Sequence, residues 1–250
     1  MPIALKKHLY SAYSRVVDIL LPATCPISGE IIDHHHTVSN QVWNNLFFID
    51  EPSCDFCSKP FDYEIEGREI CLDCDAMKPI YDKALCVLRY DEVSRSLILK
   101  FKHADHTELA PMFGRWLATR GKDFIEKADY IFPIPLHSRR LFSRRYNQAG
   151  LIAKEMVKAH NLRNESIKKR IDFTGLKRVR NTLPQGTNKA GARKINVKDA
   201  FCVSDDLELK GKTILLIDDV LTSGATVNEC AKLLKEKGAG KVFVLAVAKA

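Results

Sequence analysis

The chain has 250 residues, of which 46% are hydrophobic, so it is long enough for one full domain and a small one with a substantial core. No internal repeat or low-complexity tract appears, which excludes repeat proteins and low-complexity chains. The formal net charge of +8 supports binding of polyanions in general and does not separate one polyanion from another.

Residues 3–21 have the pattern of a basic amphipathic helix. Arg15 and Asp18 interrupt this segment, which makes it too polar for a membrane span or for the apolar region of a secretory signal. We therefore expect a cytoplasmic protein without a membrane span.

Two Cys-x-x-Cys pairs, separated by thirteen residues, predict a structural zinc site on Cys54, Cys57, Cys71 and Cys74. Four thiolates can close a tetrahedron around Zn²⁺, and no position is then left for a catalytic water. The alternatives are disulfides, an iron–sulfur cluster or four unrelated thiols. Disulfides need an oxidising compartment, and nothing in the sequence indicates export.

A weaker pattern precedes these pairs. Cys25-Pro-Ile-Ser28 looks like another knuckle in which serine replaces the second ligand. His34–His36 lies nearby and is a candidate for completing a second metal centre, but adjacent rings are hard to aim at one ion, which favours a solvated loop. The remaining cysteines are expected to be buried, unligated thiols: Cys86, Cys202 and Cys230.

Pro79 is expected to end the N-terminal part, which divides the chain into an N-terminal helix with a zinc-binding module, 1–79, and a second domain, 80–250. In the second domain, strands alternate with helices, which predicts an α/β fold with a doubly wound, mostly parallel sheet. Strands are predicted at 84–90, 130–134, 213–217 and 242–247, and helices around 93–101, 109–117, 149–157 and from 226 onward.

The loop after the second predicted strand, residues 135–148, contains four arginines and a histidine. The planar guanidinium group of arginine can donate two hydrogen bonds to phosphate oxygens, which favours a phosphate-binding loop. The alternative is a basic turn that only faces solvent. A second basic stretch, 177–196, is consistent with a mobile flap that closes over a substrate. Few aromatic residues are interleaved with these loops, so a base-stacking platform is not evident.

The most informative segment, 213–226, combines a buried-strand pattern, two carboxylates and a small, hydroxyl-rich loop before a helix. Backbone N–H groups at a helix N-terminus favour an anion such as a phosphate monoester, and ionised carboxylates accept hydrogen bonds from vicinal diols. The segment resembles the phosphoribosyl pyrophosphate (PRPP) motif of type I phosphoribosyltransferases. That resemblance assigns the ribose to Asp218 and Asp219 and the 5-phosphate to Thr222, Ser223, Gly224, Ala225 and Thr226.

Five segments in order resemble the ComF family, including ComFC-type competence proteins: 133–137, 144–148, 180–185, 193–196 and 218–226. Members join an N-terminal zinc module to a type I phosphoribosyltransferase domain and are linked to natural transformation and DNA uptake. Two residues depart from the family pattern. Ser28 replaces an expected cysteine, and Arg145 stands where glycine is usual, which bears on the backbone of its loop.

The resemblance implies PRPP as ligand together with Mg²⁺, and catalytic roles for Asp218, Asp219 and Lys102. It also implies single-stranded DNA and DNA-uptake or recombination proteins as partners. The implied pyrophosphate loop comprises Leu136, His137, Arg139, Arg140 and Arg144, and the implied flexible loop comprises Arg180, Gln185 and Arg193.

Two functions stay open. One is a Mg²⁺-dependent phosphoribosyltransferase, a glycosyltransferase with an unidentified acceptor. Thr222 stands where hypoxanthine-guanine phosphoribosyltransferases have an aspartate, which disfavours ordinary 6-oxopurine salvage. The other is a non-catalytic DNA-processing factor that keeps the fold, senses PRPP or a nucleotide, and binds single-stranded DNA.

Overall fold

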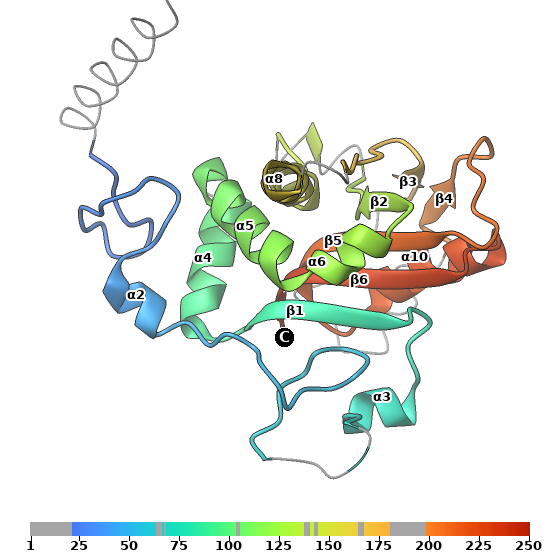
Figure 1. Ribbon diagram of the computed structural model, residues 1–250, viewed down its shortest axis with the longest axis horizontal. Coiled ribbons are helices and arrows are strands. Elements are labelled where there is room, and N and C mark those ends of the chain that lie inside the picture. Colours follow the sequence, from blue (N-terminus) through green and yellow to red (C-terminus); the bar gives the residue numbers. More distant parts are fainter. Residues whose placement is uncertain are drawn as a thin grey trace, which may run out of the picture. The chain divides into compact units, whose positions relative to one another are not determined.

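The computed structural model contains two compact units, Met1–Asn45 and Leu46–Ala250 (Figure 1). The helix predicted at 3–21 lies outside the described residues. The structure describes residues 22–63, 67, 69–103, 106–137, 141–142, 145–164, 168–180 and 199–250.

A four-stranded parallel sheet forms the centre of the second unit (Figure 1). Its strand order is β1-β6-β5-β2, and every neighbouring pair runs parallel. The predicted fold class is therefore confirmed. The strands are β1 (Lys83–Arg89), β2 (Tyr130–Pro133), β5 (Thr213–Leu221) and β6 (Lys241–Lys249).

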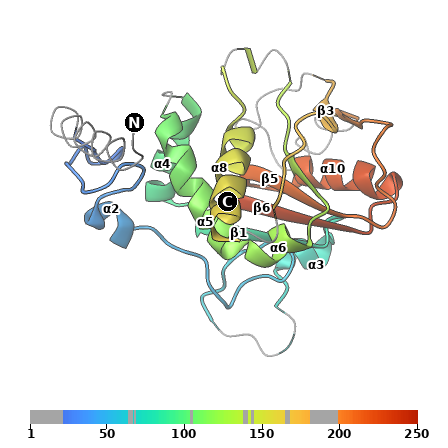
Figure 2. The ribbon, with the colours of Figure 1, turned by 45° about the horizontal axis from the view of Figure 1, so that its top comes forward.

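Helices cover both faces of this sheet, as the apolar runs of its strands require (Figures 1 and 2). On one face lie α5 (Ala110–Arg120) and α8 (Gln148–Arg163), which pack on each other and on the strands. A Cβ on Gly114 would lie 2.6 Å from the backbone nitrogen of Met156, so only glycine permits this close approach of α5 to α8.

The opposite face packs against α10 (Ala225–Glu236). Ile214 and Leu216 of β5 share one buried cluster with the apolar side of α10, namely Val227, Cys230, Ala231 and Leu234. This side of the helix is the one that the helical spacing of the sequence predicts. The other helices are α2 (Asn40–Asn44), α3 (Leu72–Ala76), α4 (Glu92–His103), η1 (Thr107–Leu109) and α6 (Lys122–Lys127).

A small antiparallel ribbon consists of β3 (Leu176–Arg178) and β4 (Phe201–Val203). The basic stretch that is predicted as a flap therefore begins inside a strand. Residues 181–198, including Gln185 and Arg193, lie outside the described residues. Arg180 is described: it is exposed and lies two residues after the end of β3.

The outer edge of β1 is covered by the segment that carries the paired cysteines. The N–H of Ala84 donates to the carbonyl of Phe56 at 2.7 Å. Ser58 Oγ accepts from the N–H of Cys86 at 3.2 Å and donates to the carbonyl of Ala84 at 3.1 Å. An uncovered strand edge would expose unpaired backbone groups, so this segment completes the sheet. The predicted domain boundary at residue 79 stays a prediction.

Candidate functional site at the end of strand β5

Strand β5 continues four residues beyond the predicted end at Ile217. Val220 and Leu221 pair in register with Ala248 and Lys249 of β6, which extends the ladder past the two acidic residues. Successive side chains of a strand point to opposite faces, so Asp218 and Asp219 enter different surroundings.

Asp218 lies on the α10 side and lines a pocket. Burial, and secondarily the charge of Asp219, raise the pKa of Asp218 to about 7. The backbone N–H of Asp219 donates to Asp218 Oδ1 at 2.8 Å and favours the ionised form. Lys102 and Arg178 also lower this pKa, but less than burial raises it. Near neutral pH the carboxyl group therefore exists in both protonation states.

Asp219 faces the other way and forms an ion pair with Lys102 of α4. Their atoms Nζ and Oδ1 are 2.9 Å apart, and their side chains are only 20% and 14% exposed, respectively. The structure thus brings together three residues that the sequence assigned to catalysis.

The pocket beside Asp218 has an empty volume of about 200 Å³, part of it open to solvent. The predicted phosphate loop supplies half of its lining residues: Thr222, Gly224, Ala225 and Thr226. Gly224 has a φ of 72° and caps α10, which starts at Ala225 rather than at Thr226. This left-handed conformation suits glycine and turns the first N–H groups of α10 toward the loop. Ser223, the remaining residue of the loop, is exposed.

Two further cations lie at the site: Lys249, which was not predicted, and Arg178, which belongs to the basic stretch predicted as a flap. Lys249 Nζ donates to the carbonyl of Thr222 at 3.2 Å, so a cation from the end of β6 lies at the phosphate loop. Arg178 lies within electrostatic reach of Asp218 from the end of β3. A signal for Lys249 was available, because a polar residue at the carboxyl end of a parallel strand lies at the ligand-binding edge of the sheet.

The arginine-rich loop starts and ends beside this site. Asn147 Nδ2 donates to the carbonyl of Ile134 at 3.0 Å, which ties the two ends of the loop together. The hydroxyl of Tyr146 donates to the carbonyl of Phe101 at 2.7 Å, directly before Lys102.

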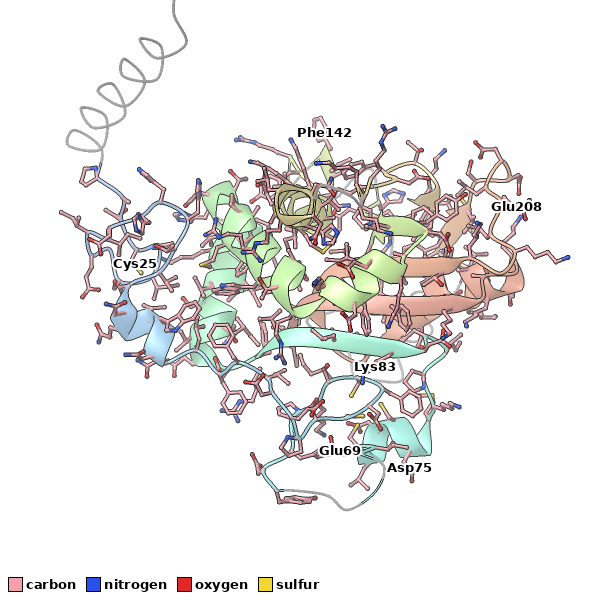
Figure 3. The ribbon with its side chains drawn as sticks, in the orientation of Figure 1. Cys25, Glu69, Asp75, Lys83, Phe142 and Glu208 are labelled. Atoms are coloured by element: carbon pink, nitrogen blue, oxygen red, sulfur yellow. The ribbon has the colours of Figure 1, made fainter. Side chains whose placement is uncertain are left out.

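Within that loop, the predicted ligands Leu136 and His137 are partly buried. The predicted ligands Arg139, Arg140 and Arg144 lie outside the described residues. Arg145, which stands where glycine is usual, has a φ of 62° and so keeps a left-handed backbone. Phe142 is 91% exposed and its ring projects outward (Figure 3), so one exposed aromatic side chain accompanies the basic loop.

The four paired cysteines form one buried cluster in the segment that covers the outer edge of β1. Their sulfur atoms lie within 4.8 Å of one another, and Cys57 Sγ is 3.6 Å from Cys71 Sγ. Tetrahedral Zn–S bonds of about 2.3 Å place thiolates about 3.8 Å apart, so these side chains fit zinc. All eight cysteines are described, and none of them forms a disulfide. The cluster supports a structural zinc site, as predicted. No second group of this kind occurs among the described residues.

Two contacts connect the segment that follows the cysteines with the start of α10. Tyr81 is 3% exposed and belongs to the same buried cluster as the cysteines, and its hydroxyl lies 3.7 Å from where a Cβ on Gly224 would be. Asn228 of α10 accepts a hydrogen bond from the N–H of Ile80 at 2.7 Å. The segment that leaves the cysteines is therefore fastened to the first turn of α10.

Comparisons with known families match both parts of the chain. The double zinc ribbon domain matches residues 16–75, and the phosphoribosyl transferase domain matches residues 126–249. A crystal structure of a hypoxanthine phosphoribosyltransferase from Staphylococcus aureus is 14% identical with a TM-score of 0.34, covering 57% of this chain and 64% of that chain. No described helix is long and apolar enough to cross a membrane.

Curated relatives match across both parts. Competence protein F of Haemophilus influenzae is 28% identical, over 80% of this chain and 85% of that protein. The DNA utilization protein YhgH of Salmonella typhimurium is 31% identical, over 70% of this chain and 75% of that protein. Competence protein ComFC of Bacillus subtilis is 27% identical, over 74% and 72%. With a zinc ribbon, a phosphoribosyltransferase domain and these relatives, the chain belongs to the ComF family.

Proposed function

We propose that the chain binds PRPP at the end of β5 and is a phosphoribosyltransferase with an acceptor still to be identified. One observation carries this proposal: Asp218 and four residues of the predicted phosphate loop line one pocket at the carboxyl end of a central parallel strand, namely Thr222, Gly224, Ala225 and Thr226. Ligands of open α/β sheets bind at such edges. The phosphoribosyl transferase family match covers this segment and gives independent support.

Each part of the pocket suits a different part of PRPP. The N–H groups at the start of α10 favour the 5-phosphate, because a helix N-terminus carries unsatisfied donors and the positive end of the helix dipole. The ionised form of Asp218 accepts hydrogen bonds from ribose hydroxyls. Lys102 compensates the charge of Asp219, which would otherwise repel a polyanion from this edge.

In the proposed reaction, an acceptor nucleophile bonds to C1 of the ribose while the bond from C1 to pyrophosphate breaks, and pyrophosphate leaves with the bonding electrons. The cationic loop after β2 stabilises the departing charge, since Asn147 and Tyr146 hold its exit beside Lys102. Mg²⁺ arriving with PRPP would supply further neutralisation of the pyrophosphate.

Calorimetric titration of the full chain with PRPP and Mg²⁺ tests the binding step. We expect one site per chain and weaker binding in a double Asp218→Asn, Asp219→Asn variant that stays folded. Wild-type affinity in that variant would refute the assignment of the pocket. A pyrophosphate-release screen across bases and amines then separates turnover from binding alone.

A non-catalytic role in DNA processing is the second candidate, and exposed Phe142 favours it. An exposed aromatic ring in an arginine-rich segment of the sequence suits stacking of a nucleobase, whereas pyrophosphate binding needs no such ring. The names of the relatives, which refer to competence and DNA utilization, support a link to DNA uptake. In this role the chain is a cytoplasmic factor that binds PRPP or a nucleotide together with single-stranded DNA, and its partners are DNA-uptake or recombination proteins.

A further inference from the structure

Residues 22–45, the described part of the first compact unit, repeat the backbone of the four-cysteine ribbon. In both segments a tight turn follows the first cysteine. The N–H of Cys25 donates to the carbonyl of Glu30 at 2.7 Å, and the N–H of Cys54 donates to that of Lys59 at 2.8 Å. Four residues into each turn a left-handed residue donates back to the cysteine carbonyl, namely Gly29 at 2.9 Å and Ser58 at 3.0 Å.

The correspondence continues beyond the turn. Isolated bridges flank both turns: Thr24 with Ile31, and Ser53 with Pro60. Each segment then reaches a five-residue helix, α2 or α3, and the residue that caps the helix is Ser39 in the first case and Cys71 in the second.

This alignment identifies the residues that stand at the four ligand positions. Cys54, Cys57, Cys71 and Cys74 correspond to Cys25, Ser28, Ser39 and Val42. Only the first ligand is therefore retained, two are replaced by hydroxyls and one by a buried hydrocarbon that is 7% exposed.

The surroundings of the two first cysteines support the same alignment. Burial raises the pKa of Cys25, but hydrogen bonds from the Ser28 side chain and from the backbone N–H groups of Ser28, Ser39 and Ile27 outweigh it and lower this pKa to about 7. The thiol of Cys54 has equivalent backbone donors on Cys71, Cys57 and Phe56. The set of backbone N–H donors that surrounds the sulfur of the first cysteine is thus present in both segments.

At the former ligand positions of residues 22–45, hydrogen bonding takes the place of metal coordination. Ser28 Oγ lies 3.3 Å from Ser39 Oγ, at the place where Cys57 Sγ lies 3.6 Å from Cys71 Sγ. One thiol and two neutral hydroxyls are a poor donor set for Zn²⁺, which binds thiolates, imidazoles and carboxylates. No histidine of the 34–36 run joins Cys25 in a group of ligands among the described residues.

We propose that residues 22–45 are a zinc ribbon that has lost its metal site and is held instead by the Ser28–Ser39 hydrogen bond and the burial of Val42. The match to a double zinc ribbon implies two metals, and the residues of the first ribbon do not fit one. The full chain consequently carries one zinc, on the second ribbon.

Restoring the lost ligands tests this inference directly. Elemental analysis of the full chain should give one zinc for the wild type and two for a triple Ser28→Cys, Ser39→Cys, Val42→Cys variant. Adding Cys71→Ser to the triple variant should return the content to one, because the restored site stays filled while the second ribbon is emptied. Loading with Co²⁺ gives a further readout, since a second tetrahedral thiolate site should double the visible absorption.

Two controls cover the case in which the triple variant does not fold. Cys25→Ala in the wild-type chain should keep all of its zinc, and Ser28→Cys alone should gain none. Two zinc ions in the wild type, loss of zinc in Cys25→Ala, or a folded triple variant with one zinc would each overturn the proposal.

Discussion

Lys102 on α4 and Asp219 on β5 form an ion pair with 2.9 Å between Nζ and Oδ1. The pair lies beside two other features of the site: Asp218, whose pKa Lys102 lowers, and Phe101, whose carbonyl receives the hydroxyl of Tyr146. Lys102 therefore connects the acidic residues of β5 with the exit of the arginine-rich loop.

Lys102→Met should weaken PRPP binding at least about tenfold, or about 1.4 kcal/mol, because two adjacent carboxylates would then face a polyanion with less compensation. Lys232→Met, which removes an exposed ion pair with Glu236 on α10, is the matched control and should bind as the wild type does. Calorimetry compares the two. Equal affinity in wild type and Lys102→Met would show that the ion pair is unrelated to the ligand.

Asp218→Asn should raise stability and lower PRPP affinity. The folded state raises the pKa of Asp218 to about 7, above an unfolded value of about 3.9, so wild-type stability falls as the pH rises between these values. The variant should be more stable by on the order of 2 kcal/mol at about pH 8, and this advantage should vanish near pH 4. Urea unfolding at both values measures it. An advantage that grows toward low pH would contradict the assigned pKa.

Cys71→Ser should remove the zinc and destabilise the second unit by several kcal/mol, or a fall in melting temperature of about 10 °C. The reason is that the cysteine segment covers the edge of β1 through Phe56 and Ser58. Cys202→Ser, on β4 and outside the cluster, is the control and should keep both zinc and stability. Elemental analysis and calorimetry check the two variants. A Cys71→Ser protein that retained its zinc would disprove the site.

Arg145→Gly should stabilise the protein by about 1 kcal/mol, because a left-handed residue with a side chain is strained and glycine is not. Arg145→Ala separates this effect from loss of the guanidinium group, since alanine keeps the strain and should give no gain. The midpoints of urea denaturation compare the three proteins. Equal gains in both variants would mean that the charge, not the backbone, decides.

Single-stranded DNA should bind weakly, without sequence preference, and more weakly as salt is raised, because each neutralised phosphate releases counterions. PRPP should displace it only in part. Phe142→Ala should weaken binding by about tenfold, the effect of losing one stacked base. Leu162→Ala, on exposed apolar surface of α8, should change nothing. Fluorescence anisotropy with a labelled oligonucleotide measures these affinities, and an unaffected Phe142→Ala variant would rule out stacking on this ring.

Local pattern was sufficient to predict the strands of the sheet and the four clustered cysteines, but not Lys249 at the predicted phosphate loop. An unbroken apolar run predicted β5, and the spacing of Cys54, Cys57, Cys71 and Cys74 predicted a cluster that the structure confirms. Element ends were less predictable. β5 extends to Leu221 because β6 offers partners there, and pairing partners are not visible in the sequence of one strand.

The sequence by itself determined the fold class and the cysteine cluster, because the alternation of strands with helices and the paired spacing of the cysteines are patterns along the chain. The phosphate loop stays a prediction. Only the tertiary structure decided what meets at the site: Lys102 with Asp219, Lys249 with Thr222, and Tyr81 between the cysteines and Gly224. Residues distant in sequence meet because helices and strands pack together across the sheet. Such packing leaves no periodic pattern in the sequence from which it could be predicted. For the same reason the lost ligand positions at Ser39 and Val42 became visible only when two folded ribbons could be compared.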